Sequence, residues 1–196
     1  MEGVMITVGY SPKISDPAFE KYLLNTNRWS AIFSVIIAAI AVVGFFIYGE
    51  TSSEMDNPQA IYIGIAIGCM FILIAVYQVI TRRKDSTWDG IVTEKSSEKK
   101  QRKQNSSNDD YYIHYYLEYK VVISDDKGKS HTIIYEDDDT VYNYYNIGDR
   151  VRHHKGLNSY EKYDKSNDTI IFCNACGSLN DIKDDYCFRC SCPLLK

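Results

Sequence analysis

The sequence lacks the short motifs that mark common enzyme classes. Its 196 residues contain no Gly-x-Ser-x-Gly nucleophile motif, no phosphate-binding P-loop and no dinucleotide-binding glycine pattern. An excess of basic residues is also missing, since the net charge is −4 and the pI is near 5.6. Bulk charge therefore gives no reason to expect nucleic acid as a partner. We expect a protein that is not an enzyme.

Charge is absent from two long stretches. No residue is charged between Arg28 and Glu50 or between Asp56 and Arg82, runs of 21 and 25 positions. Each run is rich in Ile, Val, Ala and Phe and is long enough, as a helix, to cross a hydrocarbon core of about 30 Å. Soluble helices are rarely apolar on all faces over this length, and a signal-peptide core has only about 7–15 residues. Residues 29–80 are therefore predicted to form a two-helix transmembrane hairpin in the lipid bilayer.

The positions of Lys and Arg predict how this hairpin is oriented. Basic residues flank both outer ends of the hairpin: Lys13, Lys21, Arg28, Arg82, Arg83 and Lys84. The loop at 50–59 has no basic residue and carries Glu50, Glu54 and Asp56. The positive-inside rule then predicts a multi-pass protein of the inner (plasma) membrane with both termini in the cytoplasm.

Small residues recur every four positions in both runs. They are Ala60, Gly64 and Gly68 in the second run, and Ser30, Ser34 and Ala38 in the first. Such stripes let helices approach closely. Two alternatives follow: the two spans pack on each other, which we favour, or the chain forms a homo-oligomer through Gly64 and Gly68.

Residues 1–28 are predicted to be a cytoplasmic N-terminal segment with a short interfacial helix. Asp16 can cap this helix and Pro17 suits its first position, while Phe19, Tyr22 and Leu23 recur on one side. We expect that apolar side to lie on the inner leaflet. A polar lead-in to the first span is the alternative.

Residues 86–165 are predicted to form a small all-β cytoplasmic domain. Strand-like composition and turn signals place strands at 88–95, 111–124, 130–135 and 150–154. A short helical turn is expected after Asp139 or Thr140. Four short strands around one helical turn suggest a barrel-like or sandwich-like fold.

Within this domain, residues 96–110 are predicted to be a mobile basic loop. Its cations are Lys99, Lys100, Arg102 and Lys103. We favour a solvated loop over contact with anionic lipid. Nine tyrosines lie between residues 111 and 145, and core packing accounts for most of them. Those on the outside suggest a protein-binding face.

Residues 166–196 are predicted to be a zinc ribbon. Two Cys-x-x-Cys pairs, Cys173 with Cys176 and Cys187 with Cys190, have the spacing of a tetrahedral site built from two tight turns. Four thiolates would close the coordination shell, so we expect structural zinc and no catalytic metal. Cys192 is expected to be a non-ligating thiol beside the site, although it could replace Cys190.

Two resemblances to known proteins agree with the predicted architecture. Residues 173–192 resemble the short zinc-ribbon tails of many bacterial membrane proteins, except that Ser191 stands where the second glycine is usual. The two apolar runs, residues 90–92 and residues 148–151 (Gly-Asp-Arg-Val) resemble a family of uncharacterised bacterial proteins that join two spans to a small β domain. That family's aromatic-x-Pro ending is missing here, where residues 152–156 intervene. Both resemblances imply an architecture and no activity.

The function expected from these features is a membrane-anchored, non-enzymatic protein-interaction or assembly module with a structural zinc site on the cytoplasmic face. Its partner would be an unidentified cytoplasmic or membrane protein. One alternative is a membrane-tethered nucleic-acid-binding protein that uses the basic loop and the ribbon. The other is a self-assembling envelope protein. Nucleic acid is disfavoured because residues 166–196 carry more acidic than basic side chains.

Overall fold

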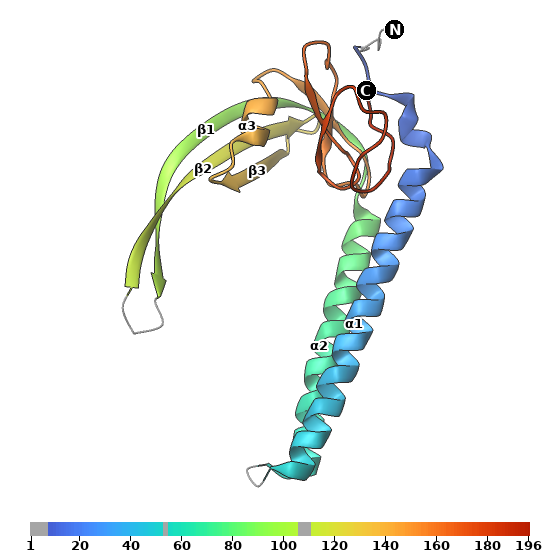
Figure 1. Ribbon diagram of the computed structural model, residues 1–196, viewed down its shortest axis with the longest axis vertical. Helices are drawn as coiled ribbons and strands as arrows, with labels where there is room; N and C mark the ends of the chain where they lie inside the picture. Colours follow the sequence, from blue (N-terminus) through green and yellow to red (C-terminus); the bar gives the residue numbers. More distant parts are fainter. Residues whose placement is uncertain (1–7, 53–54, 106–110) are drawn as a thin grey trace.

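A computed structural model of the chain describes residues 8–52, 55–105 and 111–196. Two long helices, α1 (Pro17–Thr51) and α2 (Asn57–Lys84), run antiparallel (Figure 1). The rest of the chain lies at one end of this helix pair. A 3₁₀ turn, η1 (Pro12–Ser15), precedes α1. A curved β domain and a loop-rich C-terminal part sit at the open end of the helix pair. Glu54 and the side chain of Arg83 lie outside the described residues.

Helix α1 begins where the sequence predicts but does not form a separate interfacial helix. The Asp16 carboxylate accepts a hydrogen bond from the Ala18 N–H at 2.8 Å, and Pro17 occupies the first position. From there one helix of 35 residues, about 52 Å long, continues to Thr51. Since no Gly or Pro interrupts the sequence from Ala18 to Val43, nothing ends the first turns before the apolar run begins. The prediction of a separate interfacial helix is thus wrong, because these residues form the first turns of α1.

The two helices pack through their small residues. A Cβ atom added at Gly64 would lie 3.0 Å from the Phe45 Cβ and 3.2 Å from the Ala41 carbonyl oxygen, and one at Gly68 would lie 3.3 Å from the Ala38 oxygen. This close approach confirms that the two apolar runs pack on each other. Oligomerisation through Gly64 and Gly68 stays a prediction, and it would have to use surfaces that α1 already covers.

Most of the helix surface is apolar and exposed. The most apolar 18-residue stretches of α1 and α2 have mean hydropathies of 2.7 and 2.5. Only 6% and 11% of the residues in these stretches are buried. Core helices of soluble proteins are mostly buried, so these helices differ from them. Both are long and apolar enough to cross a membrane.

The β domain is built on one antiparallel sheet with the strand order β3-β2-β1-β4-β5. Its strands are β1 (Trp88–Asn105), β2 (Tyr111–Asp125), β3 (Ser130–Glu136), β4 (Arg150–His153) and β5 (Tyr160–Lys162). A short helix, α3 (Thr140–Tyr144), packs near β2. The buried core comprises Val92, Val121, Ile123, Tyr144, Tyr145, Val151 and Phe172. A separate two-stranded sheet is formed by β6 (Ile170–Phe172) and β7 (Leu179–Asp181).

The sheet differs from the predicted barrel or sandwich. Among the described strands, β3 and β5 are its two open edges, so it does not close on itself. The prediction of a loop at 96–110 is also wrong for residues 96–105, because β1 continues through them. These residues pair with β2, and the last pair is Asn105 with Tyr111. Residues 106–110 lie outside the described residues. Figure 1 shows these paired segments as a long curved extension of the sheet.

The neighbouring strand β2 explains why residues 96–105 form a strand and not the predicted loop. The polar stretch of β1 has weak strand propensity alone, but it faces the tyrosine-rich start of β2. Lys99 lies over the Tyr115 ring at 5.0 Å and Lys103 over the Tyr111 ring at 5.2 Å. Long basic side chains lying along aromatic rings in this way stabilise cross-strand pairs.

The packing of α1 on α2 predicts a difference between two glycines. Gly64→Leu should separate the helices and lower stability by about 1–3 kcal/mol, the usual cost of overpacking. Gly44→Leu should have little effect, since nothing lies within 4 Å of a Cβ atom there. Thermal unfolding of both variants in the same detergent checks this. Equal melting temperatures would contradict the packing.

Candidate metal centre

Two tight turns carry the paired cysteines. The first follows β6, and the Gly177 N–H donates to the Cys173 carbonyl at 2.8 Å. In the second, the Ser191 N–H donates to the Cys187 carbonyl at 2.9 Å. Gly177 and Ser191 have φ angles of +73° and +57°. The two turns therefore have the same form, and Ser191 adopts the left-handed conformation in which glycine is usual.

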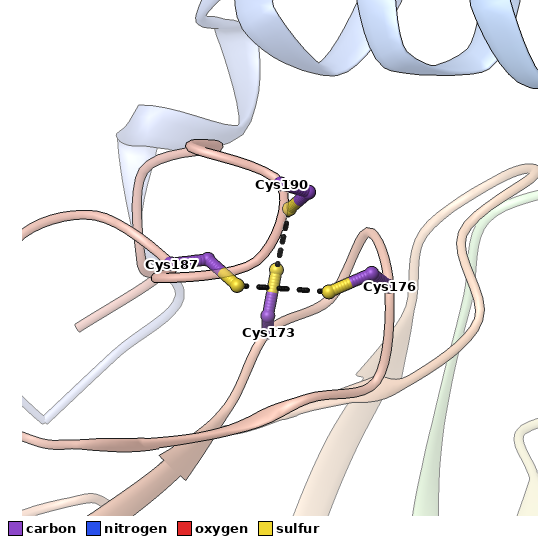
Figure 2. A group of neighbouring side chains, drawn as sticks. All are labelled: Cys173, Cys176, Cys187 and Cys190. Atoms are coloured by element: carbon purple, nitrogen blue, oxygen red, sulfur yellow. Dashed lines mark hydrogen bonds between the residues drawn. The ribbon is translucent and has the colours of Figure 1, made fainter.

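These turns bring the four predicted cysteines together (Figure 2). The sulfurs of Cys173, Cys176, Cys187 and Cys190 all lie within 4.8 Å of one another. The Cys173–Cys190 and Cys176–Cys187 sulfur pairs are 3.5 and 3.6 Å apart. A tetrahedral thiolate site with metal–sulfur bonds of about 2.3 Å has sulfur–sulfur edges of about 3.8 Å. All six cysteines are free thiols, so this group fits a metal ion.

The electrostatics of the cluster favour a cation among the sulfurs. Burial raises the pKa of Cys173 to about 12. Burial also opposes ionisation of Cys187, but backbone N–H groups, among them that of Arg189 at 3.4 Å, outweigh it and lower the Cys187 pKa to about 7. One thiolate forms readily in this setting, whereas further negative charges repel one another. A bound divalent cation would remove that repulsion and stabilise all four thiolates.

A buried asparagine joins the two turns. The side-chain Oδ1 of Asn180 accepts from the Phe188 N–H at 3.1 Å, and its Nδ2 donates to the Ser178 backbone carbonyl at 2.7 Å. Asn180 belongs to β7 and is only 5% exposed. Its hydrogen bonds hold the second turn against the first, as outer-shell groups do around metal ligands.

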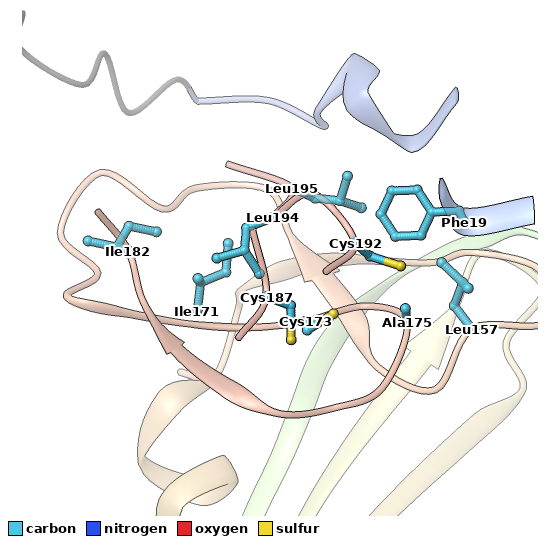
Figure 3. Close-up of a cluster of buried hydrophobic side chains, with 10 residues drawn as sticks. All are labelled: Phe19, Leu157, Ile171, Cys173, Ala175, Ile182, Cys187, Cys192, Leu194 and Leu195. Atoms are coloured by element: carbon cyan, nitrogen blue, oxygen red, sulfur yellow. The ribbon is translucent and has the colours of Figure 1, made fainter. Parts of the chain in front are cut away.

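The cluster lies in an apolar core that includes the start of α1 (Figure 3). This core contains Phe19, Leu157, Ile171, Cys173, Ala175, Ile182, Cys187, Cys192, Leu194 and Leu195. Phe19 is 4% exposed, and Tyr22 and Leu23 pack beside it. The predicted placement of this helix face on the inner leaflet is wrong, because the cysteine-rich residues cover it.

Cys192 lies in the same core but outside the group of four. Its sulfur contacts the Ala18 carbonyl oxygen of α1 at 3.7 Å, and burial raises the pKa of its thiol. Cys192 therefore contributes to the contact between helix and turns. We name residues 170–196, with both turns and this core, the cysteine module.

A buried ionic cluster provides a second connection to the N-terminal segment. Glu161, on β5, accepts from the Ser11 N–H at 2.6 Å and from the Lys165 Nζ at 3.0 Å, and its other oxygen lies 2.7 Å from His154 Nε2. The Lys165 Nζ also donates to the Gly9 carbonyl at 3.2 Å. Burial lowers the pKa of Lys165. Sequence reasoning missed this cluster, since its members carry no motif.

Comparison of the chain with protein-family models, curated proteins and solved structures gives no match. The cysteine geometry and the contacts of the cysteine module are therefore the observations that bear on function.

The geometry separates the roles of two neighbouring cysteines. Cys190→Ala should abolish stoichiometric metal binding, because three thiolates would remain. Cys192→Ala should keep the metal and cost about 1 kcal/mol for the lost buried sulfur. Metal analysis and thermal unfolding of the purified variants check this. Equal metal loss in both would contradict the assignment.

The left-handed Ser191 predicts a stabilising substitution. Glycine would remove about 1–2 kcal/mol of backbone strain from the folded state. This gain exceeds the entropic cost of ordering a glycine on folding, which is about 0.5–1 kcal/mol. Ser191→Gly should thus raise stability slightly, measured by chelator resistance and melting temperature. Gly177→Ser should lower both. A destabilised Ser191→Gly variant would contradict the turn geometry.

Proposed function

We propose that this chain is a membrane-anchored, non-enzymatic protein-interaction or assembly module with a structural zinc site on the cytoplasmic face of the cell membrane. One observation carries the proposal: Cys173 and Cys187 of the four-sulfur cluster share a buried core with Phe19 in the first turn of α1, and α1 then continues without a break into the apolar run. The site would thus fasten the β domain to its membrane anchor.

Zinc is the metal that suits these ligands best. Thiolate sulfur is a soft donor, and four thiolates in a tetrahedral arrangement favour zinc among the common cellular cations. A closed shell leaves no open position for a substrate, so the metal would act on folding. Structural zinc of this kind contributes on the order of 10–16 kcal/mol in small modules.

The flanking charges support the proposed orientation. Arg28 precedes the apolar run of α1, and Arg82 and Lys84 follow that of α2. Both sets lie at the end of the helix pair that holds the β domain, because α2 ends at Lys84 just before β1 and Arg82 donates to the Asn27 side chain at 2.6 Å. At the other end, Glu50 lies in the last turn of α1 and Asp56 immediately precedes α2. This asymmetry favours a cytoplasmic β domain.

The cysteine module also offers a surface for a protein partner. Phe188 and Tyr186 are 76% and 63% exposed, and both belong to the second turn or its approach. Large exposed aromatics are typical anchors of protein interfaces. The acidic side chains of Asp181 and Asp184 nearby argue against nucleic acid as the partner of this surface.

Two measurements on native membranes test the anchor and the metal. The protein should stay in the membrane fraction after alkaline carbonate extraction, and it should purify with one zinc ion per chain. Release by carbonate would refute the anchor, and a metal-free, folded protein would refute the zinc site.

Cross-linking in cells tests the interaction. The wild-type chain should give a discrete cross-linked product that Phe188→Ser removes without loss of zinc. Ile147→Ser is the matched control, because Ile147 is 64% exposed but lies in the turn before β4. A product that persists in Phe188→Ser, or the absence of any product, would count against this surface.

A further inference from the structure

The paired ends of β1 and β2 form a two-stranded arm whose two faces differ in chemistry. We define the arm as residues 97–105 and 111–119. Strand β3 pairs with β2 only as far as Glu118, so most of the arm projects beyond the sheet. Residues that pair across the strands share a face, and successive residues alternate between faces.

One face of the arm is ion-paired. Lys100 contacts Glu118 at 2.5 Å and Arg102 contacts Glu136 at 2.6 Å. Arg102 also covers the Tyr116 ring at 5.0 Å. Each cation on this face therefore has a partner, and the face is close to neutral.

The opposite face combines exposed apolar groups with cations that lack ion pairs. Its β2 residues are 42–64% exposed: Tyr111, Ile113, Tyr115 and Leu117. On β1 it carries Lys99 and Lys103, which pair with Leu117 and Ile113. Among the described residues of the arm this face has no carboxylate, and neither lysine has an ion pair. We name these six residues the basic apolar face.

The arm curves away from the helix pair and then in the direction in which the helices run. Figure 1 shows that its end lies below the level at which α2 leaves the helix pair. The apolar run of α2 ends at Thr81, immediately before Arg82. If α2 crosses the membrane as proposed, that level marks the membrane surface, and the end of the arm reaches the headgroup layer.

A basic cavity lies at the same level. It has a volume of about 520 Å³ and lies between the end of α2 and the β2–β3 turn. Its cations are Arg82, Lys84, Lys127 and Lys129. Of its two carboxylates, Asp125 already accepts from the N–H groups of Lys127 and Lys129. The membrane-proximal side of the β domain is therefore basic beyond the arm as well.

From these observations we propose that the basic apolar face binds the surface of an anionic phospholipid bilayer. Tyrosine rings suit the boundary between headgroups and acyl chains, and the two lysines complement the lipid phosphates. The arm would brace the β domain against the bilayer at a point away from the helix pair. This inference rests on the proposed membrane anchor.

Photo-crosslinking in the full-length protein tests the inference. The probe p-benzoylphenylalanine replaces Tyr115 on the basic apolar face or Tyr116, the neighbouring tyrosine on the ion-paired face. The protein is placed in nanodiscs of phosphatidylcholine with phosphatidylglycerol. We expect a phospholipid adduct at Tyr115 and little at Tyr116. Lys99→Gln with Lys103→Gln should lower the Tyr115 adduct at least about fivefold, given the usual contribution of each basic residue at an anionic surface.

A third probe position separates this inference from the anchor. Ile40 is 61% exposed in the middle of the α1 apolar run, so a probe there should give a lipid adduct if the helices span the bilayer. A lipid adduct at Ile40 with none at Tyr115 overturns the arm inference alone. Equal adducts at Tyr115 and Tyr116, or a protein or nucleic-acid adduct at Tyr115 in native membranes, overturn it too. No lipid adduct at Ile40 overturns the anchor.

Discussion

The cysteine module is held together by the convergence of four sulfurs, and the arrangement of the whole molecule depends on it. The module has two three-residue strands and one small core. So small a unit cannot bury enough apolar surface to stay folded alone. Four thiolates within 4.8 Å of one another would also repel each other unless a cation balanced their charge. The same core receives Phe19, so the position of α1 depends on the state of the sulfurs.

This dependence links the two ends of the chain. Phe19 and Cys192 are far apart in sequence and share one core, and the buried Glu161 cluster holds Ser11 nearby. The N-terminal segment is thus held at two places before α1 enters its apolar run. Under the proposed function, metal loss would loosen the contact between α1 and the cysteine module, while residues 85–87 would still join the β domain to α2. Such a design suits a module whose task is to hold an interaction surface at a fixed place near a membrane.

Local patterns in the sequence predicted much of this architecture. The uncharged runs predicted both helices, and the cysteine spacing identified the four residues that meet. Both signals are local, since helix formation and tight turns depend on neighbouring residues. The start of α1 shows what such local patterns do not predict. The face of Phe19, Tyr22 and Leu23 was recognised as apolar, but periodicity does not say what covers it. The apolar C-terminal pair Leu194 and Leu195 was the available hint.

The arm shows a different limit. Lys99 and Lys103 have the composition of a loop, and only the tyrosines across the strand pair make them part of β1. Strand propensity depends on such partners more than helix propensity does. The buried Glu161 cluster likewise joins residues from distant segments. Long-range pairing of this kind leaves no spacing rule in the sequence.

X-ray absorption at the zinc edge, on full-length protein purified from membranes without added metal, tests the central claim most directly. The account predicts one zinc ion per chain with four sulfur neighbours at about 2.3 Å. A first shell of nitrogen or oxygen, or a metal-free protein with these cysteines in disulfides, would contradict it.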